Sequence, residues 1–330
     1  MPIKASTGAA YSRVEGIGAA IPSRVVDNEE MTTFIETSDE WIQQRTGIVE
    51  RRWAADDETV ESLSLDAARD AMAHAGVTAA DIDAVIVSTV SHLIQTPSLA
   101  AIVAAKLGTH GAAAFDIAAA CAGFSYGLAQ ADSLVRSGAA RRVLVIGAET
   151  LSRITDTSDR ATAFLFADGA GAAIVGPSDV PAMGPVVWGS DGDQADVINM
   201  NRTWPEAVAE GLPSQITMQG QAVFRWATGF IADAARRTLD AAGLAPEELD
   251  LFVPHQANNR ITDSMLRHLK LPDTVTVGRT IRHFGNNSAA SIPIALDAMI
   301  ASGEAKSGDT CLIIGFGAGL VYAGQVITIP

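Results

Sequence analysis

The run Asp66-Ala67-Ala68-Arg69 recurs as Asp233-Ala234-Ala235-Arg236, 167 residues further along the chain. Each run has the apolar spacing of an amphipathic helix and continues to an Ala-Gly pair, Ala75-Gly76 or Ala242-Gly243. A glycine at that point suits the left-handed residue that ends many helices. A short apolar run then predicts a buried strand in each copy, over residues 84–87 and 251–253.

A second pair of segments matches in the same order. Cys121 lies 16 residues before the serine of the pair Ser137-Gly138, and Asn286 lies 16 residues before the serine of the pair Ser302-Gly303. The residues between are helical in pattern, and an apolar strand follows each pair, over residues 143–147 and 311–315. Chance similarity between Ala-rich helices is the alternative, but two matches in one order favour an internal duplication.

The pattern predicts an α/β protein of two related halves, residues 1–178 and 179–330, that join near Gly176-Pro177-Ser178. Each half reads helix, strand, helix, strand, and its continuous apolar strands are typical of parallel sheets covered on both faces. A last strand, over residues 169–175 or 320–329, could close each sheet antiparallel. Helices stacked between two sheets would give five layers. We interpret the polar stretch 190–218, which contains Trp204-Pro205, as an inserted loop.

Composition and charge narrow the class of protein. The 330 residues are 48% hydrophobic and 18% charged, which predicts a large buried core and excludes a disordered chain. A formal net charge of −15 argues against nucleic acid as a partner. Polar residues interrupt every apolar stretch before the roughly 18 residues that span a bilayer. Residues 1–11 lack the layout of a secretory signal, so we expect a cytoplasmic protein with no membrane segment.

The sequence contains two cysteines, Cys121 and Cys311, which is too few for a disulfide framework or a Cys-based zinc site. Two unpaired thiols fit a reducing compartment. The chain has no cluster of metal-ligating residues and no nucleotide-phosphate motif. We therefore expect no bound cofactor.

Cys121 is the first candidate catalytic residue. It follows Ala118-Ala119-Ala120 and precedes Ala122-Gly123-Phe124, at an expected turn from a strand into a helix. Unpaired N–H groups and the positive end of the helix dipole are expected to lower the pKa of a thiol at such a turn. The small neighbours would let an acyl group approach closely. The alternative, an inert core cysteine, is not excluded by position alone.

His255 and Asn286 are the second and third candidates. His255 lies just past a predicted strand end, where open α/β sheets present functional groups, although a hydrogen-bonded loop histidine is the plainer interpretation. Asn286 could be an ordinary helix N-cap. The duplication changes this comparison, because two-fold symmetry would bring the helix starts at Cys121 and Asn286 together, with His255 beside them.

Three motifs then carry a resemblance to a known family. Cys121 in Ala-Ala-Ala-Cys-Ala-Gly-Phe, the His255-Gln256-Ala257-Asn258 run and the Gly285-Asn286-Asn287-Ser288-Ala289-Ala290-Ser291 run resemble motifs of the thiolase superfamily. From Val14 to the C-terminus the chain is most similar to the β-ketoacyl-acyl carrier protein synthase III family of actinobacterial type. The resemblance implies a thiolase-like five-layered α-β-α-β-α fold, acyltransferase activity without a cofactor, and a homodimer.

The resemblance implies a catalytic triad of Cys121, His255 and Asn286. An acyl-CoA would load its acyl group on Cys121 as a thioester. Malonyl-acyl carrier protein (malonyl-ACP) would then lose CO₂, and N–H groups of neutral His255 and of Asn286 would stabilise the enolate oxygen. One such donor is worth about 3–4 kcal/mol in the barrier. Attack of the carbanion on acyl-Cys121 would give 3-oxoacyl-ACP, the first condensation of type II fatty-acid synthesis.

Further positions follow from the same resemblance. The backbone N–H groups of Cys121 and Ala318 would form an oxyanion hole, with Ala318 where many relatives carry Gly. Gln95 and Thr96 would line the acyl pocket. Thr96 is smaller than the Phe of some relatives, so we expect room for branched or longer acyl groups.

The resemblance also implies contacts to both substrates. For CoA the implied residues are Trp41, Arg45, Arg160 and Asn258, and the spacing of Trp41 and Arg45 puts ring and guanidinium on one helix face. For the acidic ACP they are Gln256, Ala257, Asn258, Asn259, Arg260, Arg225 and Arg267. A solvated or packing role is the alternative for Trp41, Arg45 and Arg160, and a solvated helix face is the alternative for the ACP-facing arginines.

The same residues also bear on other possible functions. A degradative thiolase would carry a second catalytic Cys immediately before the final Gly-rich run, where this chain has Gly315, while Cys311 fits a core strand. A cysteine hydrolase would gain nothing from Asn286. A specialised polyketide-priming ketosynthase or acyltransferase stays open. A non-catalytic subunit is the alternative from another class, but such relatives lose the nucleophile and this chain keeps it.

Overall fold

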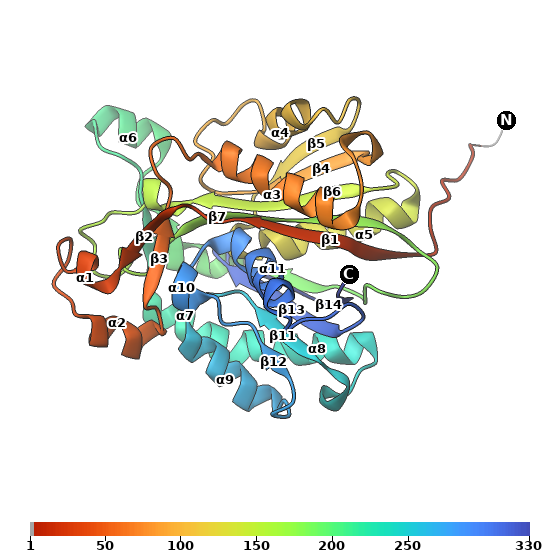
Figure 1. Cartoon of the computed structure of the whole chain (residues 1–330). Helices are drawn as coiled ribbons and strands as arrows, with labels where there is room; N and C mark the ends of the chain where they lie inside the picture. Colours follow the sequence, from red (N-terminus) through yellow and green to blue (C-terminus); the bar gives the residue numbers. More distant parts are fainter. Residues whose placement is uncertain (1–2) are drawn as a thin grey trace.

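Two five-stranded sheets form the centre of the molecule (Figure 1). The structure is a computed structural model that describes residues 3–330. The first sheet has the strand order β1 (Tyr11–Ala20), β7 (Asp168–Ser178), β6 (Val143–Thr150), β4 (Ala84–Ser88), β5 (Ala113–Ile117). The second has the order β8 (Val187–Ser190), β14 (Val321–Thr328), β13 (Thr310–Gly317), β11 (Leu251–Pro254), β12 (Thr276–Val277).

The two sheets correspond strand by strand. β4 and β6 are parallel, as are β11 and β13, and the closing strands β7 and β14 run antiparallel to their neighbours. The predicted strands and their antiparallel closure are therefore confirmed. The strands of the first sheet fall within residues 1–178 and those of the second within 179–330. The division into two halves at residue 178 stays a proposal.

Helices form three layers around the sheets. α5 (Gly123–Ser137) and α11 (Ser291–Ser302) lie between them, because α5 contacts β6 and β13 while α11 contacts β7 and β11. The outer face of the first sheet is covered by α3 (Val60–Ala75) and α4 (Leu99–Leu107), and that of the second by α8 (Ala232–Ala242) and α9 (Asn259–Leu269) (Figure 1). The expected five-layered α-β-α-β-α fold is confirmed.

The repeated helices end as their sequence predicts. α3, α5, α8 and α11 are followed by glycines with φ of 66°, 76°, 72° and 78°, at Gly76, Gly138, Gly243 and Gly303. The left-handed conformation is easily reached without a Cβ, and it redirects the chain toward the next strand.

The layer between the sheets holds an apolar core that fixes α5 against α11. Phe124 and Leu128 of α5 belong to the same buried cluster as Ile292 and Leu296 of α11. Burial of one such side chain contributes roughly 1.5–3 kcal/mol. This packing determines where the N-terminal ends of the two helices lie.

The segment between β1 and α3 lies at one end of the molecule, on the left in Figure 1. Between β1 and α3 the chain forms β2 (Arg24–Asp27), α1 (Asn28–Met31), α2 (Asp39–Thr46) and β3 (Glu50–Trp53). The short helix α10 (Ile281–Phe284) packs against β3. Helix α7 (Gly220–Trp226) continues through the π-helical turn Ala227–Ile231 into α8. Single 3-10 turns span Ala79–Asp81, Leu151–Arg153 and Pro246–Glu248.

The prediction of a loop over residues 190–218 is wrong in part. This stretch contains the 3-10 segment Gly192–Val197, helix α6 (Trp204–Glu210) and an antiparallel pair, β9 (Ile198–Met200) with β10 (Ile216–Met218). Thr203 and Glu206 form a capping box at the start of α6, with Pro205 in the first turn. The Thr-x-x-Glu spacing was the signal for this helix. Within residues 3–330, no helix has both the length and the apolar character that crossing a membrane requires.

The close approach of β6 to the turn before α11 gives a stability prediction. A Cβ on Gly147 would lie 2.3 Å from the carbonyl oxygen of Ala289. We expect Gly147→Ala to lower the free energy of unfolding by about 1–3 kcal/mol, because both backbones must shift. Gly229→Ala is the matched control, since a Cβ there meets nothing within 4 Å. Urea denaturation measures both, and equal stability of the two variants would contradict the close approach.

Candidate active site

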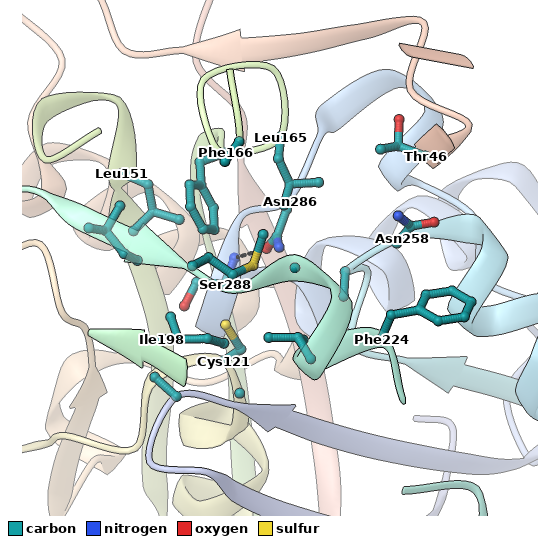
Figure 2. Close-up of a pocket in the computed structure, with 18 of the residues that line it drawn as sticks. Thr46, Cys121, Leu151, Leu165, Phe166, Ile198, Phe224, Asn258, Asn286 and Ser288 are labelled. Atoms are coloured by element: carbon teal, nitrogen blue, oxygen red, sulfur yellow. Dashed lines mark hydrogen bonds between the residues drawn. The ribbon is translucent and has the colours of Figure 1, made fainter. Parts of the chain in front are cut away.

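A cavity of about 660 Å³ opens where the two halves meet. Cys121 of the first half lines it together with His255, Asn286 and Ala318 of the second. Figure 2 shows the Cys121 sulfur directed into the cavity near Asn286 and Ser288, with Phe224 and Asn258 toward another side. The structure therefore brings the three residues of the predicted triad to one cavity.

Cys121 lies in the 3-10 turn Ala120–Ala122, directly before α5. The chain turns sharply between β5 and this helix, and Ala120 takes a φ of 43°, which is unusual for a residue with a Cβ. Gly285, which precedes Asn286 in the second half, has a φ of 70°. The matching 3-10 turn of the second half is Ser288–Ala290, whose Ser288 has a φ of 49°, and Asn286 lies two residues before it.

The thiol of Cys121 does not have the lowered pKa that the sequence predicts. Burial raises the pKa of Cys121 to about 12, opposed by a hydrogen bond with the Ser288 hydroxyl, and the negative charge of Glu149 adds to the rise. The expectation does not hold, because burial disfavours the charged form of the thiol. The thiol is therefore protonated at neutral pH and must give up its proton to act as a nucleophile.

His255 follows β11 and is fixed by its backbone N–H, which donates to the carbonyl of Ile314 on β13. Its Nδ1 lies 2.7 Å from the Oγ of Ser291, which also accepts the backbone N–H of Gln256. We assign the ring proton to Nε2, the tautomer in which the Ser291 hydroxyl donates to Nδ1. Burial lowers the pKa of His255 to about 3, so the ring is neutral at pH 7.

Asn286 is held on both sides of its backbone. Its N–H donates to the carbonyl of Leu165, and its own carbonyl accepts the N–H of Ala167. The side-chain Oδ1 accepts the N–H of Ser288 at 2.9 Å, so the amide NH₂ is the part left to act on a ligand. The next residue has a structural role, because Asn287 Nδ2 donates to the carbonyls of Asp168 and Phe284.

The turn between β13 and β14 runs directly against the thiol. A Cβ on Gly317 would come within 3.0 Å of the Cys121 sulfur, so this approach requires glycine. Ala318, the next residue, lines the same cavity. Its position is compatible with the oxyanion role that the resemblance implies, and that role stays a proposal.

Arginine side chains surround the open side of the cavity. The guanidinium groups of Arg45 and Arg160 lie 5.1 and 4.8 Å from the ring of Trp41. Arg225 and Arg260 also line the cavity. On a chain with a net charge of −15, this basic rim is the part of the surface suited to phosphate groups and acidic partners.

Asn258 joins two elements of this rim. Its Nδ2 donates to the carbonyl of Arg45 at the end of α2, and its Oδ1 accepts the N–H of Arg260 at the start of α9. Asn258 and Ala257 both line the cavity. Arg267 is exposed further along α9 and does not line the cavity. Asn259 Oδ1 accepts a hydrogen bond from Arg279.

Gln256 does not have the place that the sequence predicts for a carrier-protein contact. It is 1% exposed. Its Nε2 donates to the carbonyls of Pro254 and Gly278, and its Oε1 accepts the N–H of Ile281. This prediction is wrong, because a side chain that braces β11 against its neighbours is not available to a partner.

Gln95 and Thr96 also lie outside the cavity of the single chain. Both are exposed on the connection between β4 and α4. The prediction that they line the acyl pocket is therefore not met within one chain. Within one chain the small Thr96 side chain gives no basis for expecting room for branched or longer acyl groups. Leu151, Ile198 and Phe316 supply the apolar lining instead.

Two polar residues of the site were missed in the sequence. Ser288 lies in the cavity wall, and its Oγ donates to Oε1 of Glu149 at 3.0 Å. Glu149 is fully buried on β6, and burial raises its pKa to about 7. The available signal was an acidic residue directly after the apolar run 143–148.

The buried imidazole gives a pH prediction. The pKa of His255 is far lower when folded than in the unfolded chain, so protonation below about pH 6.5 favours unfolding. Between pH 6.5 and 5 we expect wild type to lose about 2 kcal/mol of unfolding free energy relative to His255→Gln. Urea denaturation across this range measures the difference, and parallel pH profiles would contradict a buried neutral ring.

A cysteine and an asparagine from the connections that lead into two matching helices, facing one cavity between two stacked sheets, define a condensing enzyme of the thiolase fold. The family model described as 3-oxoacyl-[acyl-carrier-protein (ACP)] synthase III matches residues 115–192, and the model of the C-terminal part of that enzyme matches residues 239–329. The chain belongs to the β-ketoacyl-acyl carrier protein synthase III family and is an acyltransferase. The family resemblance of the sequence is confirmed.

Individual relatives are similar over the full length. The β-ketoacyl-[acyl-carrier-protein] synthase III of Streptomyces glaucescens is 56% identical, with 99% of each chain covered. The mycobacterial enzyme of that name from Mycobacterium tuberculosis is 47% identical, with 99% of this chain and 98% of the relative covered. The solved structure of the priming β-ketosynthase from the R1128 polyketide biosynthetic pathway has a TM-score of 0.97 at 45% identity, and covers 100% of this chain and 99% of its own.

Proposed function

We propose that the chain transfers an acyl group from acyl-CoA to Cys121 and condenses it with malonyl-ACP, releasing CoA, CO₂ and 3-oxoacyl-ACP. The observation that carries this proposal is the meeting of a thiol, a neutral imidazole and a free amide NH₂ in one cavity. In a Cys-His-Asn hydrolase the amide orients the imidazole, whereas here Ser291 holds His255 Nδ1 and Asn286 Oδ1 accepts the N–H of Ser288.

Each group has a role that its environment supports. Cys121 bonds to the acyl carbon as the C–S bond to CoA breaks, which leaves a thioester on the enzyme. When malonyl-ACP then loses CO₂, negative charge moves to its thioester oxygen, and Nε2–H of His255 with the NH₂ of Asn286 donates to that oxygen. Neutral donors suit this step because a carboxylate at either position would repel the enolate.

The basic rim fits the two substrates. Arg45 and Arg160 beside Trp41 offer a ring and two cations to the adenine and phosphates of CoA. Arg225 and Arg260, with Arg267 further along α9, offer charges to an acidic carrier protein. The chemistry proposed here uses amino-acid side chains and backbone N–H groups, so it needs no bound cofactor, and we place it in the cytoplasm, where both thioester substrates are made.

A second copy of the chain is the partner we propose for the free edge of the first sheet. β5 is the outer strand there, and Phe115 on it is 37% exposed. Leu93 and Ile94 are 50% and 56% exposed on the connection that follows β4. An uncovered strand edge beside exposed apolar side chains is a site for pairing with another strand. A homodimer would cover both.

A priming enzyme of polyketide synthesis is the second candidate function. It is favoured by the similarity to the R1128 priming ketosynthase. The two candidates share the chemistry at Cys121 and differ in primer and carrier protein. Rates with acetyl-, isobutyryl- and longer acyl-CoA, each paired with a fatty-acid or a polyketide carrier protein, separate them.

Cys121 and Asn286 are proposed to act in different steps, loading and condensation, and this difference gives a test of the proposal. Wild type is expected to retain radiolabel from acyl-CoA, and Cys121→Ala is expected to retain none. Asn286→Ala is expected to load its acyl group within a few-fold of wild type but to condense about 10²–10³-fold more slowly, because an enolate donor is lost. Gel-filtered acyl-enzyme and 3-oxoacyl-ACP formation measure the two steps. Acyl retention on Cys121→Ala would exclude Cys121 as the nucleophile.

Carrier-protein docking is tested by charge reversal. Arg260→Glu is expected to raise the KM for malonyl-ACP about tenfold or more with little change in kcat, and the effect should shrink as salt is added. Arg141→Glu is the matched control, because Arg141 is an exposed arginine before β6 and outside the cavity lining. An equal KM for both variants would place docking elsewhere.

A further inference from the structure

The proposed chemistry leaves one proton unassigned. Cys121 is a protonated thiol, and the neutral His255 is a weak base because burial opposes its positive form. A thioester forms only if the thiol proton leaves as the sulfur attacks. A proton acceptor close to the sulfur is therefore required during loading.

Glu149 is a buried carboxyl group that no step of the proposed condensation uses. Its Oε2 accepts hydrogen bonds from the hydroxyls of Thr89 and Ser91 and from the N–H of Val90, at 3.3, 2.6 and 3.1 Å. Its Oε1 accepts from Ser288 Oγ at 3.0 Å, and no other donor to Oε1 is found in residues 3–330. The two oxygens therefore differ, since Oε2 accepts three hydrogen bonds and Oε1 accepts one, from a residue of the cavity wall.

Ser288 connects this carboxylate to the sulfur. Its hydroxyl donates to Glu149 Oε1, and the turn that contains Ser288 packs against the turn that contains Cys121, with both residues in the cavity wall. Ser288 has a φ of 49°, and its N–H is held by Asn286 Oδ1. A non-glycine residue in the left-handed region is strained, so the surroundings hold the Ser288 backbone in place, and the bond to Glu149 directs its hydroxyl.

We propose that Glu149 is a positioning residue that takes up the Cys121 proton through Ser288 while the acyl group is loaded. This inference rests on the proposed function. As the Cys121 S–C bond forms, the thiol proton passes to Ser288 Oγ and the Ser288 proton passes to Glu149 Oε1. The C–S bond to CoA breaks, and the CoA thiolate recovers the proton along the same path. Charge and protons balance without another reactant.

The electrostatic surroundings of Glu149 fit this role. Cys121 is the titratable group that faces its carboxyl among the described residues, while Asp168 on neighbouring β7 turns its carboxylate to Ser152 and to the N–H of Ala54. No ion pair within residues 3–330 involves Glu149. A carboxyl without a cation, whose pKa is about 7, can both accept and release a proton near neutral pH.

The test compares two reactions of Cys121 in full-length wild type and Glu149→Gln. Acylation by acyl-CoA, followed by rapid quench and mass spectrometry, requires the proton to leave as the new bond forms. Alkylation by iodoacetamide reads how much thiolate is present. We expect acylation at pH 8 to be about 100-fold slower in the variant. We expect alkylation to be as fast or faster, because the charge that raises the Cys121 pKa is gone.

The pH profile and two further variants complete the test. Wild-type acylation should rise through about pH 7 as Glu149 ionises, and this rise should be absent in Glu149→Gln. Ser288→Ala should slow acylation in the same way. Ser91→Ala is the matched control, because Ser91 bonds the other carboxyl oxygen, so its loss should move the rise to higher pH and not abolish it.

The outcomes are distinct. Slower acylation with undiminished alkylation supports the relay. Faster acylation and faster alkylation together would show that Glu149 acts only as a charge, and equal slowing of both would show a structural role, so either result overturns it. Absence of acyl transfer to wild-type Cys121 would instead overturn the proposed function.

Discussion

The packing of α5 against α11 is the constraint on which the site depends. Each sheet sends one helix into the layer between them, and the shared core of Phe124, Leu128, Ile292 and Leu296 sets their relative position. Cys121 lies in the turn that leads into α5, and Asn286 lies in the connection that leads into α11, so the positions of the two helices constrain both residues. The catalytic geometry is therefore a property of the contact between halves, and neither half could present it alone.

Burial then shifts the protonation of Cys121, His255 and Glu149. The same loss of water raises the pKa of Cys121, lowers that of His255 and raises that of Glu149, so the thiol and the imidazole are neutral at pH 7. Neutral N–H donors suit an enolate, but a neutral thiol is a poor nucleophile. The low solvation of the site therefore favours the condensation step, in which an enolate is stabilised. Loading of the acyl group requires in addition that the thiol proton be removed.

The sequence was sufficient for the duplicated fold because its signals are local. The Ala-Gly and Ser-Gly helix ends and the apolar strands recur in order, and each is decided within a few residues. The start of α6 was equally local, at Thr203 and Glu206, but was hidden in a polar stretch. Cys121, His255 and Asn286 were found because symmetry and motif coincided. Gln256 was misplaced because a motif does not distinguish a side chain that faces a partner from one that braces a strand.

What the sequence could not supply is how tightly distant segments approach. The pKa of Cys121 depends on its burial and on Glu149 and Ser288, which lie far along the chain, and reasoning from the local helix start does not include them. The same applies to Glu149. In the sequence it is only a residue at the end of an apolar strand, and its hydrogen bonds with Ser91 and Ser288 are known only from the structure. Because a buried carboxyl without a cation is costly, its retention at this point needs a reason beyond packing. Glutamine would serve the same four hydrogen-bonding neighbours nearly as well without that cost, whereas only a carboxyl group can take a proton and return it.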